Sequence, residues 1–128
     1  MTPEGKELKA VTAWLKEAKL PYIRMALQPG VAAGWPDLLI LPPGGLCFFI
    51  EMKAPGKKPN PLQERRLDLL NNFRYIHGWF DNAPDAIDFI TRNVSTLLDR
   101  WHAAGGASLS ALAATSLHEP GGGVPGDA

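Results

Sequence analysis

The chain has 128 residues, with 13 basic and 13 acidic side chains and a formal net charge of zero at pH 7. This length fits one domain with a single hydrophobic core, and the lone cysteine, Cys47, excludes an internal disulfide bridge. Zero net charge argues against a protein that coats nucleic acid non-specifically, and no apolar stretch has the length of a signal peptide or a transmembrane segment, so we expect a cytoplasmic protein without a membrane partner.

The first half of the chain predicts one helix and three strands. Pro3 suits a first helical turn, and apolar residues at helical spacing predict a helix over residues 2–18. A first strand is expected over residues 22–27, before a loop rich in Gly and Ala. Residues 37–41 and 46–52 are nearly all apolar, which is typical of central strands that are covered on both faces.

The second half predicts a helix, a strand and a last helix. Asn60 and Pro61 form an N-cap and first-turn pair that opens a helix through residue 72. Residues 73–79 are expected to form a fourth strand, parallel to the strand before that helix because such crossovers are right-handed. Asp81 or Asn82 would cap the last helix. The order αβββαβ(α) predicts an α/β domain over residues 1–102, with a central four-stranded sheet flanked by helices.

The composition changes near the C-terminus. Residues 103–128 contain 6 of the 13 glycines and no aromatic residue. Such a segment has too few apolar side chains to build a core, so we expect a disordered tail, with a weak Ala-rich helix at residues 108–117 as the alternative.

Two acidic residues lie on the two central strands. A hairpin would bring Asp37, at the start of one strand, beside Glu51, near the end of the next. Carboxylates this close repel one another unless a cation neutralises them, and Mg²⁺ or Mn²⁺ takes one or two carboxylates from a protein. Lys53 points to the same face of its strand as Glu51. A metal, an activated water and a fixed positive charge are the parts that phosphodiester hydrolysis requires. In a simpler interpretation, Asp37 caps its strand and Glu51 pairs with Lys53.

The motifs around these residues resemble a known family. The segments Gly34-Trp35-Pro36-Asp37, Phe49-Ile50-Glu51-Met52-Lys53 and Asn60-Pro61-Leu62-Gln63 resemble the VRR-NUC branch of the PD-(D/E)XK nuclease superfamily, over residues 4–90. The resemblance implies a restriction-endonuclease-like core with a mixed sheet and a Mg²⁺- or Mn²⁺-dependent DNA endonuclease. The catalytic residues that it implies are Asp37, Glu51, Lys53 and Gln63. The metal contacts that it implies come from Asp37, Glu51, the backbone carbonyl of Met52, and Glu4 on the first helix, with Glu7 as the alternative.

Basic residues near the expected site are candidate DNA contacts. They are Lys57 and Lys58 on the loop after Glu51, and Arg65 and Arg66 on the following helix. Trp35 could stack on a base. The simpler interpretations are solvated surface charges and, for Trp35, an aromatic that anchors its loop.

The family resemblance also bears on the substrate. It implies action on branched DNA, such as four-way junctions, by a homodimer in a bacterial or phage-infected cell. The alternative is a nuclease-fold module that binds DNA and is catalytically silent or depends on a partner protein.

Overall fold

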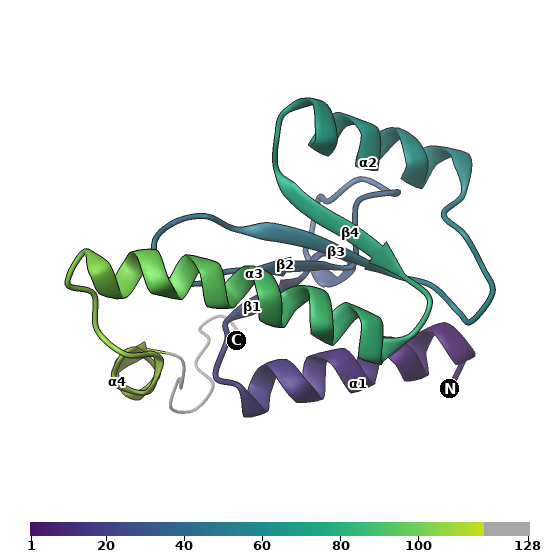
Figure 1. Ribbon diagram of the computed structural model, residues 1–128. Coiled ribbons are helices and arrows are strands. Elements are labelled where there is room, and N and C mark those ends of the chain that lie inside the picture. Colours follow the sequence, from purple (N-terminus) through teal and green to yellow (C-terminus); the bar gives the residue numbers. More distant parts are fainter. Residues whose placement is uncertain (117–128) are drawn as a thin grey trace.

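The computed structural model describes residues 1–116 and has an α/β fold in three layers (Figure 1). The expected order of helices and strands is confirmed. Among the described residues, no helix has the length and hydrophobicity needed to cross a membrane. The elements are α1 (Pro3–Glu17), β1 (Tyr22–Arg24), the 3₁₀ helix η1 (Met25–Leu27), β2 (Leu38–Ile40), β3 (Phe48–Met52), α2 (Pro61–Asn72), β4 (Ile76–Phe80), α3 (Ala83–Ala103) and α4 (Leu109–Ser116).

The four strands form one mixed sheet in the order β1-β2-β3-β4. β1 pairs antiparallel with β2, β2 antiparallel with β3, and β3 parallel with β4. The central positions of β2 and β3 and the parallel crossover through α2 were all expected from the sequence. Leu38 pairs with Ile50, so the residues one step outward, Asp37 and Glu51, come together where β2 begins.

Helices cover both faces of the sheet. α1 and α3 lie on one face and α2 lies on the other (Figure 1). Side chains alternate between the two faces of a strand, and on β3 Phe48, Ile50 and Met52 are fully buried in the core shared with α1 and α3. Each such side chain contributes roughly 1.5–3 kcal/mol on burial. Glu51 therefore points to the opposite face, which α2 covers.

All four strands are shorter than the sequence indicated, and β1 and β4 differ for identifiable reasons. We expected a first strand to residue 27, but Met25–Leu27 forms a 3₁₀ turn. We expected the fourth strand to begin at Phe73, but Phe73 is the C-cap of α2, and Arg74 adopts a positive φ of 65°. This left-handed residue ends the helix and turns the chain into β4. The alternating pattern of side chains over residues 73–79 therefore covers two elements, the end of α2 and the start of β4.

The chain beyond α3 contains the helix that we gave as the alternative to disorder. α4 spans Leu109–Ser116, and Leu109 packs against the core. The Trp101 indole N–H donates to the Ala107 carbonyl at 2.7 Å, which fixes the turn between α3 and α4. The rest of the expected tail, residues 117–128, lies outside the described residues, and the domain boundary at residue 102 stays a prediction.

Side-chain caps set where α1 and α3 begin. Thr2 accepts from the Gly5 amide at 3.0 Å, and Asn82, rather than Asp81, accepts from the Asp85 amide at 2.9 Å. The Glu7 carboxylate on α1 accepts from the amide of Ala83, the first residue of α3, at 2.8 Å. A carboxylate at a helix N-terminus also interacts favourably with the helix dipole. Glu7 therefore joins the two helices on this face.

Gly34 permits a close approach between the loop before Asp37 and α2. Its φ is +91°, and a Cβ there would lie 2.6 Å from Leu62 Cγ. We expect Gly34→Ala to destabilise the fold by about 2–4 kcal/mol, since left-handed strain and overpacking add together. Gly30→Ala is the matched control, because Gly30 has a φ of +79° and, apart from its own chain neighbours, no atom of the described residues would lie within 4 Å of a Cβ at that position. Urea denaturation midpoints measure both, and equal losses would show that Leu62 yields without cost.

Candidate active site

Asp37 and Glu51 meet where β2 begins and β3 ends. The Met52 amide donates to Asp37 Oδ2 at 2.7 Å, so the Asp37 carboxylate bridges the two strands in addition to the sheet hydrogen bonds. Asp37 is half-buried, whereas Glu51 is only 2% exposed. The arrangement that the hairpin predicted is therefore present, with two carboxylates at one end of the sheet.

The surroundings of these two carboxyl groups disfavour their charged forms. Burial raises the pKa of Glu51 to about 8 from an ordinary value of 4.5, and the charge of Asp37 acts in the same direction, partly opposed by Lys53. Burial also raises the pKa of Asp37 above its ordinary value, against the effect of the Met52 amide. Two carboxyl groups that are costly to ionise would gain from a bound cation.

Lys53 lies among the acidic side chains. Its Nζ is 3.9 Å from Glu51 Oε2 and 3.6 Å from Glu4 Oε1, and it donates to Gln63 Oε1 at 3.2 Å. The side chain of Lys53 is 13% exposed. Its ammonium group thus contacts three side chains, and the Lys53 side chain as a whole is mostly buried.

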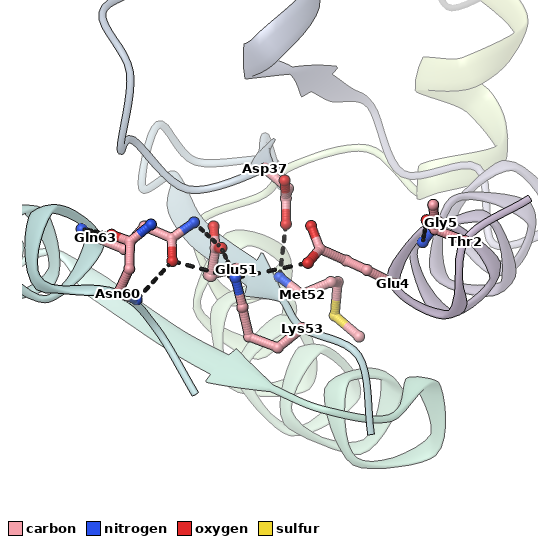
Figure 2. Close-up of polar contacts among 9 residues, drawn as sticks. All are labelled: Thr2, Glu4, Gly5, Asp37, Glu51, Met52, Lys53, Asn60 and Gln63. Atoms are coloured by element: carbon pink, nitrogen blue, oxygen red, sulfur yellow. Dashed lines mark hydrogen bonds and ion pairs between the residues drawn. The ribbon is translucent and has the colours of Figure 1, made fainter. Parts of the chain in front are cut away.

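Gln63 connects the strand residues to α2. Its Nε2 donates to Glu51 Oε2 at 2.9 Å, while its Oε1 accepts from both Lys53 and the Asn60 amide. The Gln63 amide in turn donates to Asn60 Oδ1 at 2.8 Å. These reciprocal bonds form a capping box at the start of α2. Figure 2 shows the resulting cluster, in which the helix cap fixes the orientation of the glutamine between Glu51 and Lys53.

The structure separates the two glutamates proposed for the first helix. Glu4 points toward Lys53 and the end of β3 (Figure 2). Its charge also contributes to the raised pKa values of Asp37 and Glu51. Glu7 instead caps α3 through Ala83. Of the two, only Glu4 lies with the candidate site residues.

The candidate DNA contacts fall into two groups. Lys57, Lys58 and Arg65 are exposed, and the loop before the two lysines is held where the Gly56 amide donates to the Asp81 carboxylate at 2.9 Å. This hydrogen bond lowers the pKa of Asp81.

Arg66 and Trp35, the other two candidate DNA contacts, pack against each other. The Arg66 guanidinium carbon lies 4.9 Å from the centre of the Trp35 ring, and Arg66 also donates to the Ala33 carbonyl at 3.4 Å. The Arg66 Nε is buried and has no hydrogen-bond partner within the described residues. This placement agrees with the simpler interpretation of Trp35 as a loop anchor. It also makes Arg66 a support for the loop that leads into Asp37.

The donor set fits a hard divalent cation. Among the described residues, no group of three or more His, Cys, Asp or Glu side chains is arranged to hold a metal ion. Mg²⁺ needs only one or two protein carboxylates, since waters and substrate oxygens complete its coordination. Asp37 and Glu51 each use one oxygen in a hydrogen bond, which leaves further lone pairs. The Met52 carbonyl lies beside them on β3, and its role as a ligand stays a prediction.

Comparison with solved structures identifies the fold. No family model matches the chain. A solved structure described as "VRR_NUC domain" aligns with a TM-score of 0.61 and 23% identity, over 71% of this chain and 97% of that one. The fold is that of a VRR_NUC domain. A second, described as "VRR_NUC domain protein", aligns with a TM-score of 0.59 and 22% identity, over 74% of this chain and 90% of that one.

One curated protein is also similar to a part of this chain. "Putative nuclease p44" of Acyrthosiphon pisum secondary endosymbiont phage 1 is 49% identical over 39 residues, which is 30% of this chain and 41% of that protein. The match thus spans less than half of the phage protein. The resemblance to VRR-NUC proteins that the motifs indicated, and the restriction-endonuclease-like fold, are confirmed at the level of structure.

Two supports of the candidate site were missed in the sequence analysis. Asn60 was identified as an N-cap, but its reciprocal bond with Gln63 was not, although Asn60-x-x-Gln63 has the spacing of a capping box. The contact between Arg66 and Trp35 was also missed. No local pattern connects two residues so far apart in the sequence, so only the packing of the loop on α2 shows it.

Proposed function

We propose that this protein is a Mg²⁺- or Mn²⁺-dependent DNA endonuclease. The observation that carries the proposal is the hydrogen-bonded set of Glu51, Gln63 and Lys53 beside Asp37, at the end of the two central strands of a VRR_NUC fold. The likeness to a phage protein described as a nuclease supports it. We also propose that it is a soluble enzyme of a phage or prophage and acts in the bacterial cytoplasm.

The charged groups have distinct tasks in this proposal. Asp37, Glu51 and the Met52 carbonyl, with Glu4 alongside, would hold the cation, which supplies Lewis acidity at the scissile phosphate when it is bound. Lys53 would position the attacking water and offset the negative charge that develops on the phosphate. Gln63 holds both Lys53 and Glu51 in place, because its amide is fixed by Asn60. Exposed Lys57, Lys58 and Arg65 would contact phosphates away from the cut.

We further propose branched DNA as the substrate and a homodimer as the active form. Residues 1–116 form the nuclease-like domain and its C-terminal helices, with no separate recognition domain among them. Recognition of DNA shape through two symmetric sites is therefore a physically reasonable route. Two such sites would nick a four-way junction on two strands.

Cleavage of labelled DNA tests the proposal directly. Purified protein is incubated with four-way junction, flap and linear duplex DNA in Mg²⁺, Mn²⁺ or EDTA. We expect products with either metal, none in EDTA, and the fastest cleavage for the junction, with paired symmetric nicks. A folded protein that binds these DNAs but cuts none of them with either metal would instead be a binding module or a partner-dependent enzyme.

Glu4 and Glu7 provide a matched pair of alanine substitutions. We expect Glu4→Ala to weaken activation by Mg²⁺ by about 10-fold, as losses near a metal site commonly do, with little change in stability because its side chain is 41% exposed. Glu7→Ala removes the acceptor of the Ala83 amide and should cost about 1–2 kcal/mol of stability, with metal activation unchanged. Urea denaturation measures the stability of the two variants, and cleavage across a Mg²⁺ titration measures their activation. Loss of Mg²⁺ activation in Glu7→Ala but not in Glu4→Ala would show that Glu7, rather than Glu4, belongs to the site.

A further inference from the structure

A pocket of about 520 Å³ lies beside the candidate active site, between α2 and the edge strand β4. Lys58 is a candidate DNA contact, and the other residues of the pocket walls lie outside the candidate active site. Figure 1 shows α2 lying across β4 on the face opposite α1 and α3. The polar and aromatic side chains that line the pocket are Lys58, Glu64, Asp68, Asn71, His77 and Trp79.

The register of the sheet places this pocket next to Glu51. Glu51 on β3 pairs with Trp79 on the parallel strand β4. Paired residues of neighbouring strands point to the same face of the sheet, and the two strands lie about 4.8 Å apart. Glu64, at one wall of the pocket, directly follows Gln63 on α2. The pocket and the candidate catalytic centre are therefore adjacent, and one strand of substrate can reach both.

The chemistry of the walls favours a nucleobase over a phosphate. Trp79 is 38% exposed and lines the pocket, so a flat ring can stack on it. Glu64 and Asp68 would repel a phosphate, but together with Asn71 they can accept hydrogen bonds from the amino and imino groups of a base. Lys58, which is exposed on the loop at the catalytic end, is suited to the phosphate that joins this base to the next nucleotide.

We propose that this pocket binds an unpaired nucleobase of the DNA strand being cut, stacked on Trp79, immediately beside the scissile phosphate. The inference rests on the proposed nuclease function and gives it a source of substrate preference. A base within a continuous duplex is paired and stacked, and it would have to leave the helix at an energetic cost to enter the pocket. In a flap the base is already unpaired, and at a branch point the stacking is interrupted, so the pocket selects DNA in which a base at the cleavage position leaves the helix at low cost.

Binding without catalysis provides the first test. Fluorescence anisotropy of a labelled single-stranded oligonucleotide is measured in EDTA with wild type, Trp79→Ala, Trp79→Phe and Phe73→Ala. We expect Trp79→Ala to weaken binding by about 5- to 100-fold, the range for loss of one base–aromatic stack, and Trp79→Phe to restore most of it. Phe73, which is 68% exposed and outside the pocket, is the control, and Phe73→Ala should bind as wild type does. Equal affinity of wild type and Trp79→Ala would overturn the inference.

A single abasic nucleotide, moved along the flap or junction strand, gives a test that needs no protein variant. We expect wild type to show a raised KM for cleavage only when the missing base is next to the cut. Trp79→Ala should show no further loss at that position, because the two changes remove the same contact. An equal rise in KM at every abasic position would overturn the inference about the pocket. Because the DNA is still cut in that case, the proposed nuclease function would stand. Absence of cleavage with retained, Trp79-dependent binding would overturn the nuclease and uphold the pocket.

Discussion

Replacing Lys53 by alanine is expected to lower the rate of metal-dependent DNA cleavage by about 100- to 1,000-fold, the range for loss of one preorganised group that stabilises developing charge. The Lys53 ammonium lies 3.6 and 3.9 Å from two carboxylates and bonds to Gln63, so its position is set before substrate binds. Because Lys53 would act on the transition state, kcat should fall while KM changes little. Single-turnover cleavage of a labelled junction measures the rate.

Two further substitutions separate chemistry from charge. Lys16→Ala removes an exposed lysine in the last turn of α1 and should leave the cleavage rate unchanged, although the net charge falls by the same amount. Lys53→Arg keeps the charge but replaces a compact ammonium with a planar guanidinium, so we expect only partial recovery. If Lys53→Ala cuts at the wild-type rate, Lys53 serves only as an ion-pair partner of Glu4 and Glu51.

The centre of the site could be predicted because it depends on local periodicity. Residues two apart on a strand share a face, which puts Lys53 with Glu51. A hairpin between the two apolar strands then brings Asp37, at the start of one strand, beside Glu51, near the end of the other. Asn60-Pro61 marks the start of a helix, which places Gln63 in its first turn. These steps need only short-range rules.

Features that depend on tertiary packing could not be predicted in the same way. Glu4 and Glu7 lie one helical turn apart on one face of α1, so helical periodicity treats them alike. What separates them is the N-terminus of α3 at Ala83, which is distant in sequence. The start of β4 was also misplaced, because the positive φ of Arg74 gives no signal in a non-glycine residue.

Glu51→Gln is expected to abolish cleavage and yet stabilise the metal-free protein at pH 8. The raised pKa of Glu51, about 8 against an ordinary 4.5, means that the folded state keeps a proton that the unfolded state releases between these values. The contribution of Glu51 to stability in EDTA should therefore be fully present below about pH 4.5 and be lost as pH rises to about 8, by up to about 1.4 kcal/mol per pH unit. Asp37, whose pKa is also raised by burial, acts with the same sign.

Glutamine at position 51 keeps an oxygen that can accept from Gln63 but carries no proton to release. The part of the pH dependence that belongs to Glu51 should therefore disappear, and the melting temperature of Glu51→Gln should exceed that of wild type at pH 8 in EDTA. Cleavage should fall by about 1,000-fold or more, because a ligand of the proposed cation is lost and metal assistance is worth several kcal/mol. Added Mg²⁺ should raise the melting temperature of wild type much more than that of the variant.

Asp88→Asn is the control for removal of one negative charge. Asp88 pairs with Arg92 at 3.1 Å on the exposed face of α3, where both side chains are 68% exposed, and such a pair contributes about 0–1 kcal/mol. This variant should follow wild type in its pH profile, Mg²⁺ response and cleavage rate. Removal of a destabilising charge should raise the melting temperature. A Glu51→Gln protein that melts below wild type at pH 8 would instead show that Glu51 and Lys53 form a stabilising ion pair.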